Sequence, residues 1–212
     1  RLRGARPPLP RGSLPLDLRA RGNRLRGWLL PEPGEAYVVM GDPAEGLATS
    51  HLSAAVVRRA SDWAHAATLS GHVTPGDFGG ALAALGGVYN QALVGWERNN
   101  HGWGVAERLL RLRYAPIYTY HGIADQKGDG RQGFPTSQWN KPDLVGMVHE
   151  AMVGGNWKSW DAELLGQYRE LQDLGDKRYA TDTLDLVSAD LLCHAARTQA
   201  RLFPPSTPRP TR

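Results

Sequence analysis

The sequence predicts an α/β fold in which a central mixed sheet of about five or more strands is flanked by helices on both faces. Two observations predict this class. Short apolar runs bounded by turn residues come first, and helical patterns then alternate with further apolar runs. The 212 residues, of which 41% are hydrophobic, suit one globular domain with tails. A single cysteine, Cys193, excludes an internal disulfide framework.

Three apolar runs open the folded part. Residues 36–42 read as a buried strand, because four apolar residues precede Asp42. Residues 51–60 and 63–71 are separated by Ser61-Asp62 and predict an antiparallel hairpin that follows the first strand.

Helical and extended patterns alternate after this hairpin. Thr74 is a good N-cap and Pro75 suits the first helical position, so a helix is expected to run to about Tyr89. Asn100 is expected to cap the second helix. The remaining expected elements are a strand at 91–97, a helix at 102–113, a strand at 116–121, a loop or hairpin at 122–136, helices at 141–152 and 161–174, an edge strand at 177–180 and a helix at 182–201.

The two ends of the chain differ in composition from its middle. Residues 1–34 alternate Arg, Pro and Gly and predict a linker or arm, which leaves a folded domain at 35–201 and a disordered tail at 202–212. The net charge of +4 divides into +7 for residues 1–30, +4 for residues 197–212 and −7 for the rest. The basic ends either attract DNA phosphates without sequence specificity or serve only as solubilising segments and linkers. No apolar run approaches the roughly 20 residues of a membrane span.

Carboxylates stand at three separate ends of predicted elements. Asp42 follows the first buried strand, Glu97 ends the run at 91–97, and Asp182 and Asp185 open the last helix. Two-metal phosphodiester hydrolysis needs oxygen ligands that hold Mg²⁺ or Mn²⁺ ions about 3.5–4 Å apart. The residues therefore predict a metal-dependent nuclease. Each acid also has a structural interpretation: a turn for Asp42, a salt bridge for Glu97, and the helix dipole for the last two.

Other patterns narrow the chemistry. No GxxxxGK[ST] phosphate loop is present, and the seven histidines show no spacing typical of a zinc site. Trp96 and Trp103 flank the turn that follows Glu97. They either line a functional site or pack in the core. The candidate DNA contacts are Arg98, Arg131, Thr136 and Lys141.

Four segments in order resemble the C-terminal nuclease domain of the phage large terminase subunit, over about Tyr37 to Ala196. They are Asp-Pro-Ala-Glu-Gly at 42–46, a strand ending in Glu-Arg-Asn-Asn within 89–102, Gly-aromatic-x-Thr followed by Lys-Pro at 133–142, and an acid followed by Leu-Val-x-Ala at 185–189. The resemblance implies an RNase H-like fold and a metal-dependent endonuclease that cuts concatemeric double-stranded DNA with little sequence specificity during packaging.

Carried over by position, the resemblance makes Asp42, Glu97 and Asp185 the catalytic and metal-binding triad, with two Mg²⁺ or Mn²⁺ ions. Many members place a second acid where Leu184 stands here, and some place a polar ligand at the position of Asp182. The implied partners are double-stranded DNA, an ATPase motor domain that this sequence lacks, the small terminase subunit and the portal. The implied location is the cytoplasm of an infected bacterial host.

Two other functions remain open from the sequence. The domain could be a DNA-binding or docking module of the packaging motor with weak or no cleavage of its own. It could also be a resolvase or an RNA–DNA hybrid nuclease on the same fold.

Overall fold

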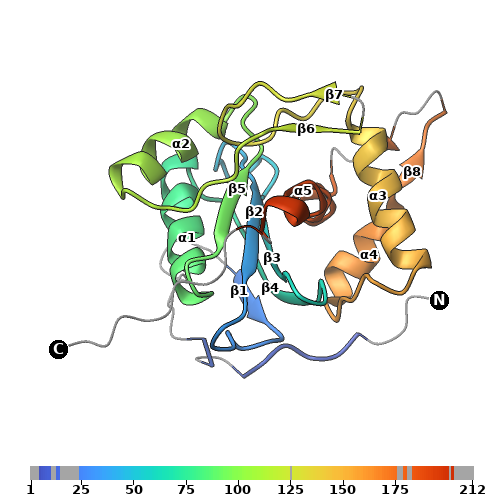
Figure 1. Ribbon diagram of the computed structural model, residues 1–212, viewed down its shortest axis with the longest axis horizontal. Coiled ribbons are helices and arrows are strands. Elements are labelled where there is room, and N and C mark those ends of the chain that lie inside the picture. The colour runs from blue at the N-terminus through green and yellow to red at the C-terminus, as the bar shows by residue number, and fades with distance from the viewer. Residues whose placement is uncertain are drawn as a thin grey trace.

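The computed structural model describes residues 5–10, 13–14, 24–124, 126–175, 179–180, 183–200 and 202. Within these residues a five-stranded mixed sheet is combined with five helices, which confirms the predicted fold class (Figure 1). The strands of the sheet are β1 (Arg24–Gly27), β2 (Tyr37–Asp42), β3 (Ser53–Arg59), β4 (His65–Gly71) and β5 (Leu93–Trp96). The helices are α1 (Pro75–Val88), α2 (Gly102–Arg111), α3 (Lys141–Val153), α4 (Ala162–Glu170) and α5 (Asp185–Ala200).

The sheet has the order β1-β4-β3-β2-β5, and only one of its pairings is parallel. β2, β3 and β4 form an antiparallel meander, to which β1 adds an edge. β5 returns through α1 and lies parallel to β2 on the other side. Two small hairpins stand outside the sheet: β6 (Gly122–Ile123) with β7 (Gln126–Lys127), and β8 (Gln172–Asp173) with β9 (Tyr179–Ala180).

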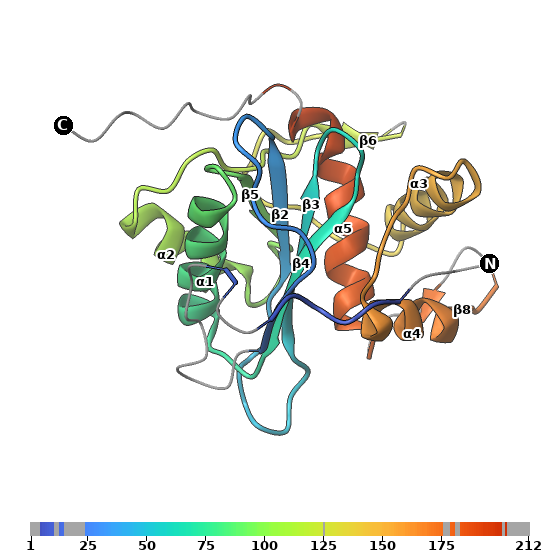
Figure 2. The ribbon, with the colours of Figure 1, turned by 90° about the horizontal axis from the view of Figure 1, so that it is seen from below.

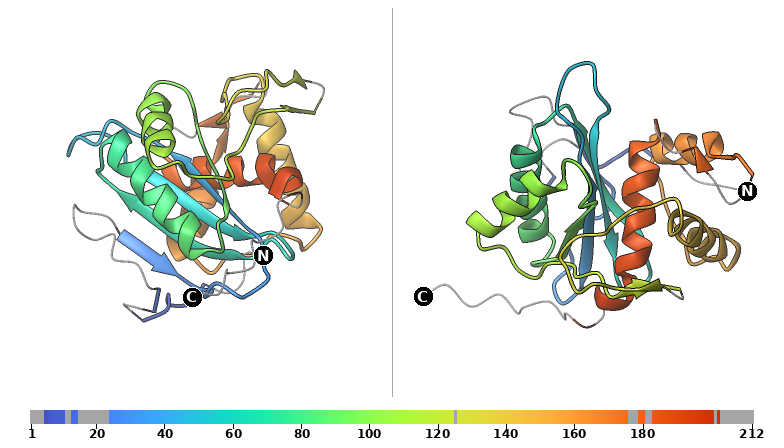
Figure 3. Two further views of the ribbon diagram at one scale, coloured as in Figure 1. Left: turned by 60° about the vertical axis from the view of Figure 1, so that its left-hand side comes forward. Right: turned by 90° about the horizontal axis from the view of Figure 1, so that it is seen from above.

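Helices cover both faces of the sheet, as predicted. α1 and α2 lie together on one face, and α5 crosses the other face, with α3 and α4 outside it (Figures 2 and 3). α5 is buried along most of its length because the sheet lies on one side of it and α3 and α4 lie on the other. In the described part of the chain, none of the helices combines the length and apolar character needed to cross a bilayer.

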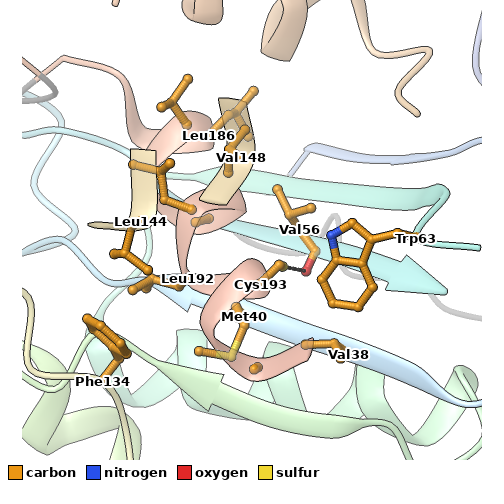
Figure 4. Packing of buried hydrophobic residues seen from close by; sticks show 14 of the residues in the cluster. Val38, Met40, Val56, Trp63, Phe134, Leu144, Val148, Leu186, Leu192 and Cys193 are labelled. Carbon is orange, nitrogen blue, oxygen red and sulfur yellow. Dashed lines mark hydrogen bonds between the residues drawn. The ribbon is translucent and has the colours of Figure 1, made fainter. Parts of the chain in front are cut away.

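Alternation along the central strands supplies two apolar cores, one on each face. Val38 and Met40 of β2 point toward α5, whereas Tyr37 and Val39 point toward α1. Figure 4 shows the α5 side, where the thiol of Cys193 donates a 3.5 Å hydrogen bond to the carbonyl oxygen of Val56. Cys193 is therefore a core residue, and burial raises the pKa of its thiol.

Most predicted elements are present within a few residues of their expected bounds. The first strand, the hairpin, the Thr74-capped helix and the strand before Glu97 are all confirmed. The final helix begins at Asp185 rather than three residues earlier. Of the edge strand predicted at 177–180, the described residues Tyr179 and Ala180 form β9, which pairs with β8 in a small hairpin apart from the main sheet.

Four local predictions were wrong. The helix expected at 161–174 ends at Glu170, and Gln172 and Asp173 form β8 instead. Residues 24–27, expected within an unfolded linker, form β1, because the open edge of β4 offers partners for their backbone groups. Residues 116–121 make only isolated bridges at Ile117 and Thr119. Asn100 does not cap α2: it takes a left-handed conformation with φ 45°, and His101 occupies the N-cap position before a helix that starts at Gly102, as expected.

The segment before β1 also packs against the domain where it is described. The Leu9 backbone N–H donates to the carbonyl of Gly27, and the guanidinium of Arg6 lies 4.0 Å from the ring centre of Trp160. Of the predicted tail at 202–212, only residue 202 is among the described residues.

Candidate metal and nuclease site

The parallel pair of strands brings two acids side by side. In the register of β2 and β5, Gly41 is paired with Trp96, and the N–H of Glu97 donates to the carbonyl of Gly41 at 2.8 Å. Parallel strands end at the same edge of a sheet, so Asp42 and Glu97 leave that edge together. When Asp42 is protonated, its carboxyl hydrogen-bonds to Glu97.

The third acid reaches the same edge from α5. This helix packs across β2 and β3, and its first residue is Asp185. The carboxylate of Asp185 accepts a 3.2 Å hydrogen bond from the backbone N–H of Leu52, in the loop between β2 and β3. The ring Nδ1 of His51 lies 3.9 Å from the other oxygen of that carboxylate.

Burial and mutual repulsion destabilise the charged forms of these acids. Burial raises the pKa of Asp42 well above its usual value, and the negative charges of Glu97 and Asp185 raise it further. Burial also raises the pKa of Asp185, although the Leu52 N–H and the nearby His51 oppose the change. In the absence of a cation, the site therefore favours a proton over a third negative charge.

The three acids line one pocket of about 560 Å³. Thr136 and Lys141, which were predicted as DNA contacts, line the same pocket. Thr136 arrives there because the segment around Phe134 runs beside the end of β5, where Arg98 N–H donates to the carbonyl of Phe134. The pocket is also lined by Pro43, Ala44, Glu45, Ser50, His51, Leu52, Asn99, Asn100, His101, Leu144, Ser188, Leu191 and Leu192.

The other two predicted DNA contacts lie outside the pocket lining. Arg98 is 21% exposed and pairs with Asp129, with one hydrogen bond of 2.9 Å. Arg131 is exposed on the loop that carries Asp129, and its backbone N–H donates to the Asp129 carboxylate. Their predicted role stays a prediction.

Two polar side chains at the acids were missed from the sequence. Ser188 lines the pocket beside Asp42, and its hydroxyl opposes the rise in the pKa of that carboxyl. The side-chain amide of Asn99 donates to Glu97 at 3.2 Å. Helical spacing could have revealed Ser188, since residues three apart share a helix face and Asp185 begins the same helix.

The other predicted residues, and one further acid at the pocket, are placed as follows. Asp182 lies outside the described residues. Trp96 is buried in the core on the α1 side and Trp103 is 73% exposed; neither lines the pocket. Glu45 is exposed at the rim of the pocket, with an oxygen 4.0 Å from Nε2 of His101.

The donor set suits a hard divalent cation. Carboxylate oxygens are the ligands that Mg²⁺ and Mn²⁺ prefer, and the repulsion that raises the pKa of Asp42 would be relieved by a positive ion. Within the described residues, however, no three His, Cys, Asp or Glu side chains already stand in the arrangement of a formed ion site. The carboxyls of Asp42 and Glu97 lie beside each other, and a cation bound between them would replace the proton that Asp42 favours in its absence.

The sheet order, the single parallel pairing and the helix that crosses one face define an RNase H-like α/β fold. Among solved structures, the chain is similar to nuclease domains of phage large terminases. A nuclease from the thermophilic phage G20c with bound magnesium matches with a TM-score of 0.62 and 17% identity, over 84% of this chain and 90% of the other. The zinc-bound form of the same nuclease matches with a TM-score of 0.58 and 18% identity, over 83% of this chain and 90% of the other.

The large terminase nuclease domain of Thermus phage P74-26 gives a TM-score of 0.60 and 15% identity, over 82% of this chain and 85% of the other. No protein-family model and no curated protein sequence matches the chain. At these identities the likeness establishes the fold.

Proposed function

We propose that this chain is a metal-dependent DNA endonuclease, the nuclease domain of a viral genome-packaging terminase, which cuts concatemeric double-stranded DNA with little sequence specificity. One observation carries the proposal: Asp42, Glu97 and Asp185 come from three distant segments and line one pocket. Structural packing alone would not place three acids together where burial and repulsion raise the pKa of Asp42. The solved nucleases of the same fold support this choice of chemistry.

The three acids would hold two divalent ions, Mg²⁺ or Mn²⁺. Asp42 and Asp185 would share one ion, and Glu97 would help to hold the second; Asp182 is a further proposed ligand. When bound, the ions supply charge stabilisation of the phosphate and activation of water. Ser188 and Asn99 hold the carboxylates of Asp42 and Glu97 in place.

Side chains around the acids would position the DNA backbone. Thr136 and Lys141 line the pocket, where a hydroxyl and an ammonium group suit phosphate oxygens. Arg98 and Arg131 lie on the adjoining surface and would extend the contact along the strand. An ATPase motor domain, the small terminase subunit and the portal are the proposed partners, in the cytoplasm of an infected bacterial host.

A plasmid-nicking assay with Mn²⁺, Mg²⁺ or EDTA tests this function on the wild type and on Asp42→Asn. Glu107→Gln, which removes the same charge from an exposed ion pair on α2, is the matched control. We expect ion-dependent nicking by the wild type and the control, and a loss of at least about 100-fold in Asp42→Asn. Nicking that persists in Asp42→Asn would contradict the assignment.

A second function is favoured by one observation, the net charge of +7 on residues 1–30, which suits non-specific attraction to DNA phosphates. The domain would then be a DNA-binding module of the packaging motor with little cleavage of its own. A folded wild type that binds DNA but nicks it with neither ion would support this function. Branched and RNA–DNA hybrid substrates, compared with plain duplex, distinguish a resolvase or hybrid nuclease from both.

A further inference from the structure

The first turn of α5 carries two of the side chains that form the pocket. Asp185 is the first residue of the helix, and Ser188 follows three residues later, so both lie on one face. The first N–H groups of any helix lack partners within the helix and need an acceptor from elsewhere. Leu184, the residue before α5, has an apolar side chain and cannot supply one.

The acceptor comes from a different helix. Oε1 of Gln167, on α4, accepts hydrogen bonds from the backbone N–H of Leu186 at 2.9 Å and of Val187 at 3.2 Å. Leu186 is 1% exposed and Val187 is fully buried, so water has little access to replace this acceptor. A single side chain therefore satisfies two N–H groups in the turn that holds Asp185.

We propose that Gln167 is a positioning residue for the carboxylate site, acting through the first turn of α5. The inference rests on the proposed function, because it concerns the same three acids. Without the cap, the first turn would fray, and Asp185 and Ser188 would lose their fixed place beside Asp42.

The rest of α5 is anchored independently of this cap. Arg58 on β3 donates to both oxygens of Asp190 at 2.5 and 2.9 Å, and both side chains are fully buried. This pair lies more than one turn beyond Asp185, so it holds the helix on the sheet but does not constrain its first residues. Loss of Gln167 should therefore disturb the site much more than the fold.

The neutral side chain also suits this position electrostatically. An Asp N-cap would satisfy the same N–H groups but would add another negative charge near acids that already repel one another. The amide oxygen of Gln167 caps the turn with no net charge.

The experiment compares Gln167→Met with Gln199→Met in the full chain. Gln199 is a matched control, because its Oε1 also accepts a backbone N–H, from Thr119 at 3.1 Å, but near the opposite end of α5. Each variant is measured for Mn²⁺ affinity by calorimetry, for kcat and KM in nicking, and for amide hydrogen exchange at Leu186 and Val187.

For Gln167→Met we expect faster exchange at both amides, a roughly tenfold weaker Mn²⁺ affinity, and a kcat lowered about 10- to 100-fold with KM for DNA unchanged. Gln199→Met should stay within about twofold of the wild type in all of these. Gln167→Glu restores an acceptor of the same length and should recover slow exchange. Gln167→Asn, shorter by one methylene group, provides a polar variant for the case in which Gln167→Met does not fold.

Equal Mn²⁺ affinity and kcat in Gln167→Met and Gln199→Met would overturn the positioning role, even if amide exchange at the first turn changed. Wild-type Mn²⁺ affinity and kcat in Gln167→Asn would overturn it as well. A folded wild type that binds no Mn²⁺ and cuts no DNA would instead overturn the proposed function, and with it any role for Gln167 in the site.

Discussion

The buried pair of Arg58 and Asp190 gives the most quantitative prediction. Burial by itself would raise the pKa of Asp190, but the charge and hydrogen bonds of Arg58 outweigh it and hold that pKa well below its usual range. Trp157 and Tyr168 also donate to the same carboxylate, at 3.0 and 2.7 Å. In Arg58→Met the carboxylate keeps these two donors but loses its counter-charge.

The loss of stability expected in Arg58→Met follows from the burial of both partners. Removing one member of a buried ion pair costs about 3–5 kcal/mol, because the other charge stays uncompensated away from water. For a domain of this size, each kcal/mol lowers Tm by about 2–4 °C, so Tm should fall by about 6–20 °C. Arg59→Met, on the next residue, is the control: Arg59 pairs with the more exposed Glu32 and Asp62, and its loss should cost about 1 kcal/mol or less.

The variant should also acquire a pH dependence. Without Arg58, burial raises the pKa of Asp190 in the folded state above its unfolded value. Such a group contributes stability below the unfolded pKa and loses it as pH rises through the folded pKa. The deficit of Arg58→Met relative to the wild type should therefore grow from pH 5 to pH 8.

Urea unfolding at several pH values, with thermal melts in parallel, measures both quantities. A deficit no larger than that of Arg59→Met would refute the reasoning, as would a deficit that does not change between pH 5 and pH 8.

Three further predictions concern the pocket and its surface. Asp42→Asn should raise the Tm of the metal-free protein in EDTA at pH 8, with a smaller gain at pH 5. Because the pKa of Asp42 is raised in the folded state, its carboxyl destabilises the fold increasingly as pH rises. A lower Tm of Asp42→Asn than of the wild type at pH 8 would contradict this prediction. Gly102→Ala places a Cβ 2.4 Å from the carbonyl oxygen of Glu97, so it should lower the free energy of unfolding by about 1–3 kcal/mol and reduce nicking. Its control is Gly87→Ala on α1, where the added Cβ meets open space and should not destabilise the fold. Arg131→Ala should lower the salt slope of DNA binding by about 1, measured by titration at several salt concentrations, and an unchanged slope would remove Arg131 from the interface.

Local patterns were sufficient for the elements that carry two of the acids. A buried apolar run followed by an acid identified both Asp42 and Glu97, because a buried strand shows in the sequence as consecutive apolar residues. The sequence also indicated Asp185 near the start of a helix. Its helical periodicity gave no information on where that helix would lie.

Several features of the site depend on partners far away in the chain. Arg98 pairs with Asp129, which lies 31 residues later. The cap of α5 comes from Gln167, about 20 residues before the N–H groups it satisfies. No local signal marks such contacts, because they exist only once two elements have packed together.

The sequence by itself determined the α/β class, the strand ends that bear Asp42 and Glu97, and a final helix with Asp185 near its start. These depend on hydrophobic periodicity and turn chemistry, which act over a few residues. Only the tertiary structure decided that β5 lies parallel beside β2, that α5 crosses the sheet to bring in the third acid, and that residues 24–27 complete an edge. The physical reason is that strand pairing and helix packing are selected by burial of surface between distant segments, a free energy that no short stretch of sequence contains.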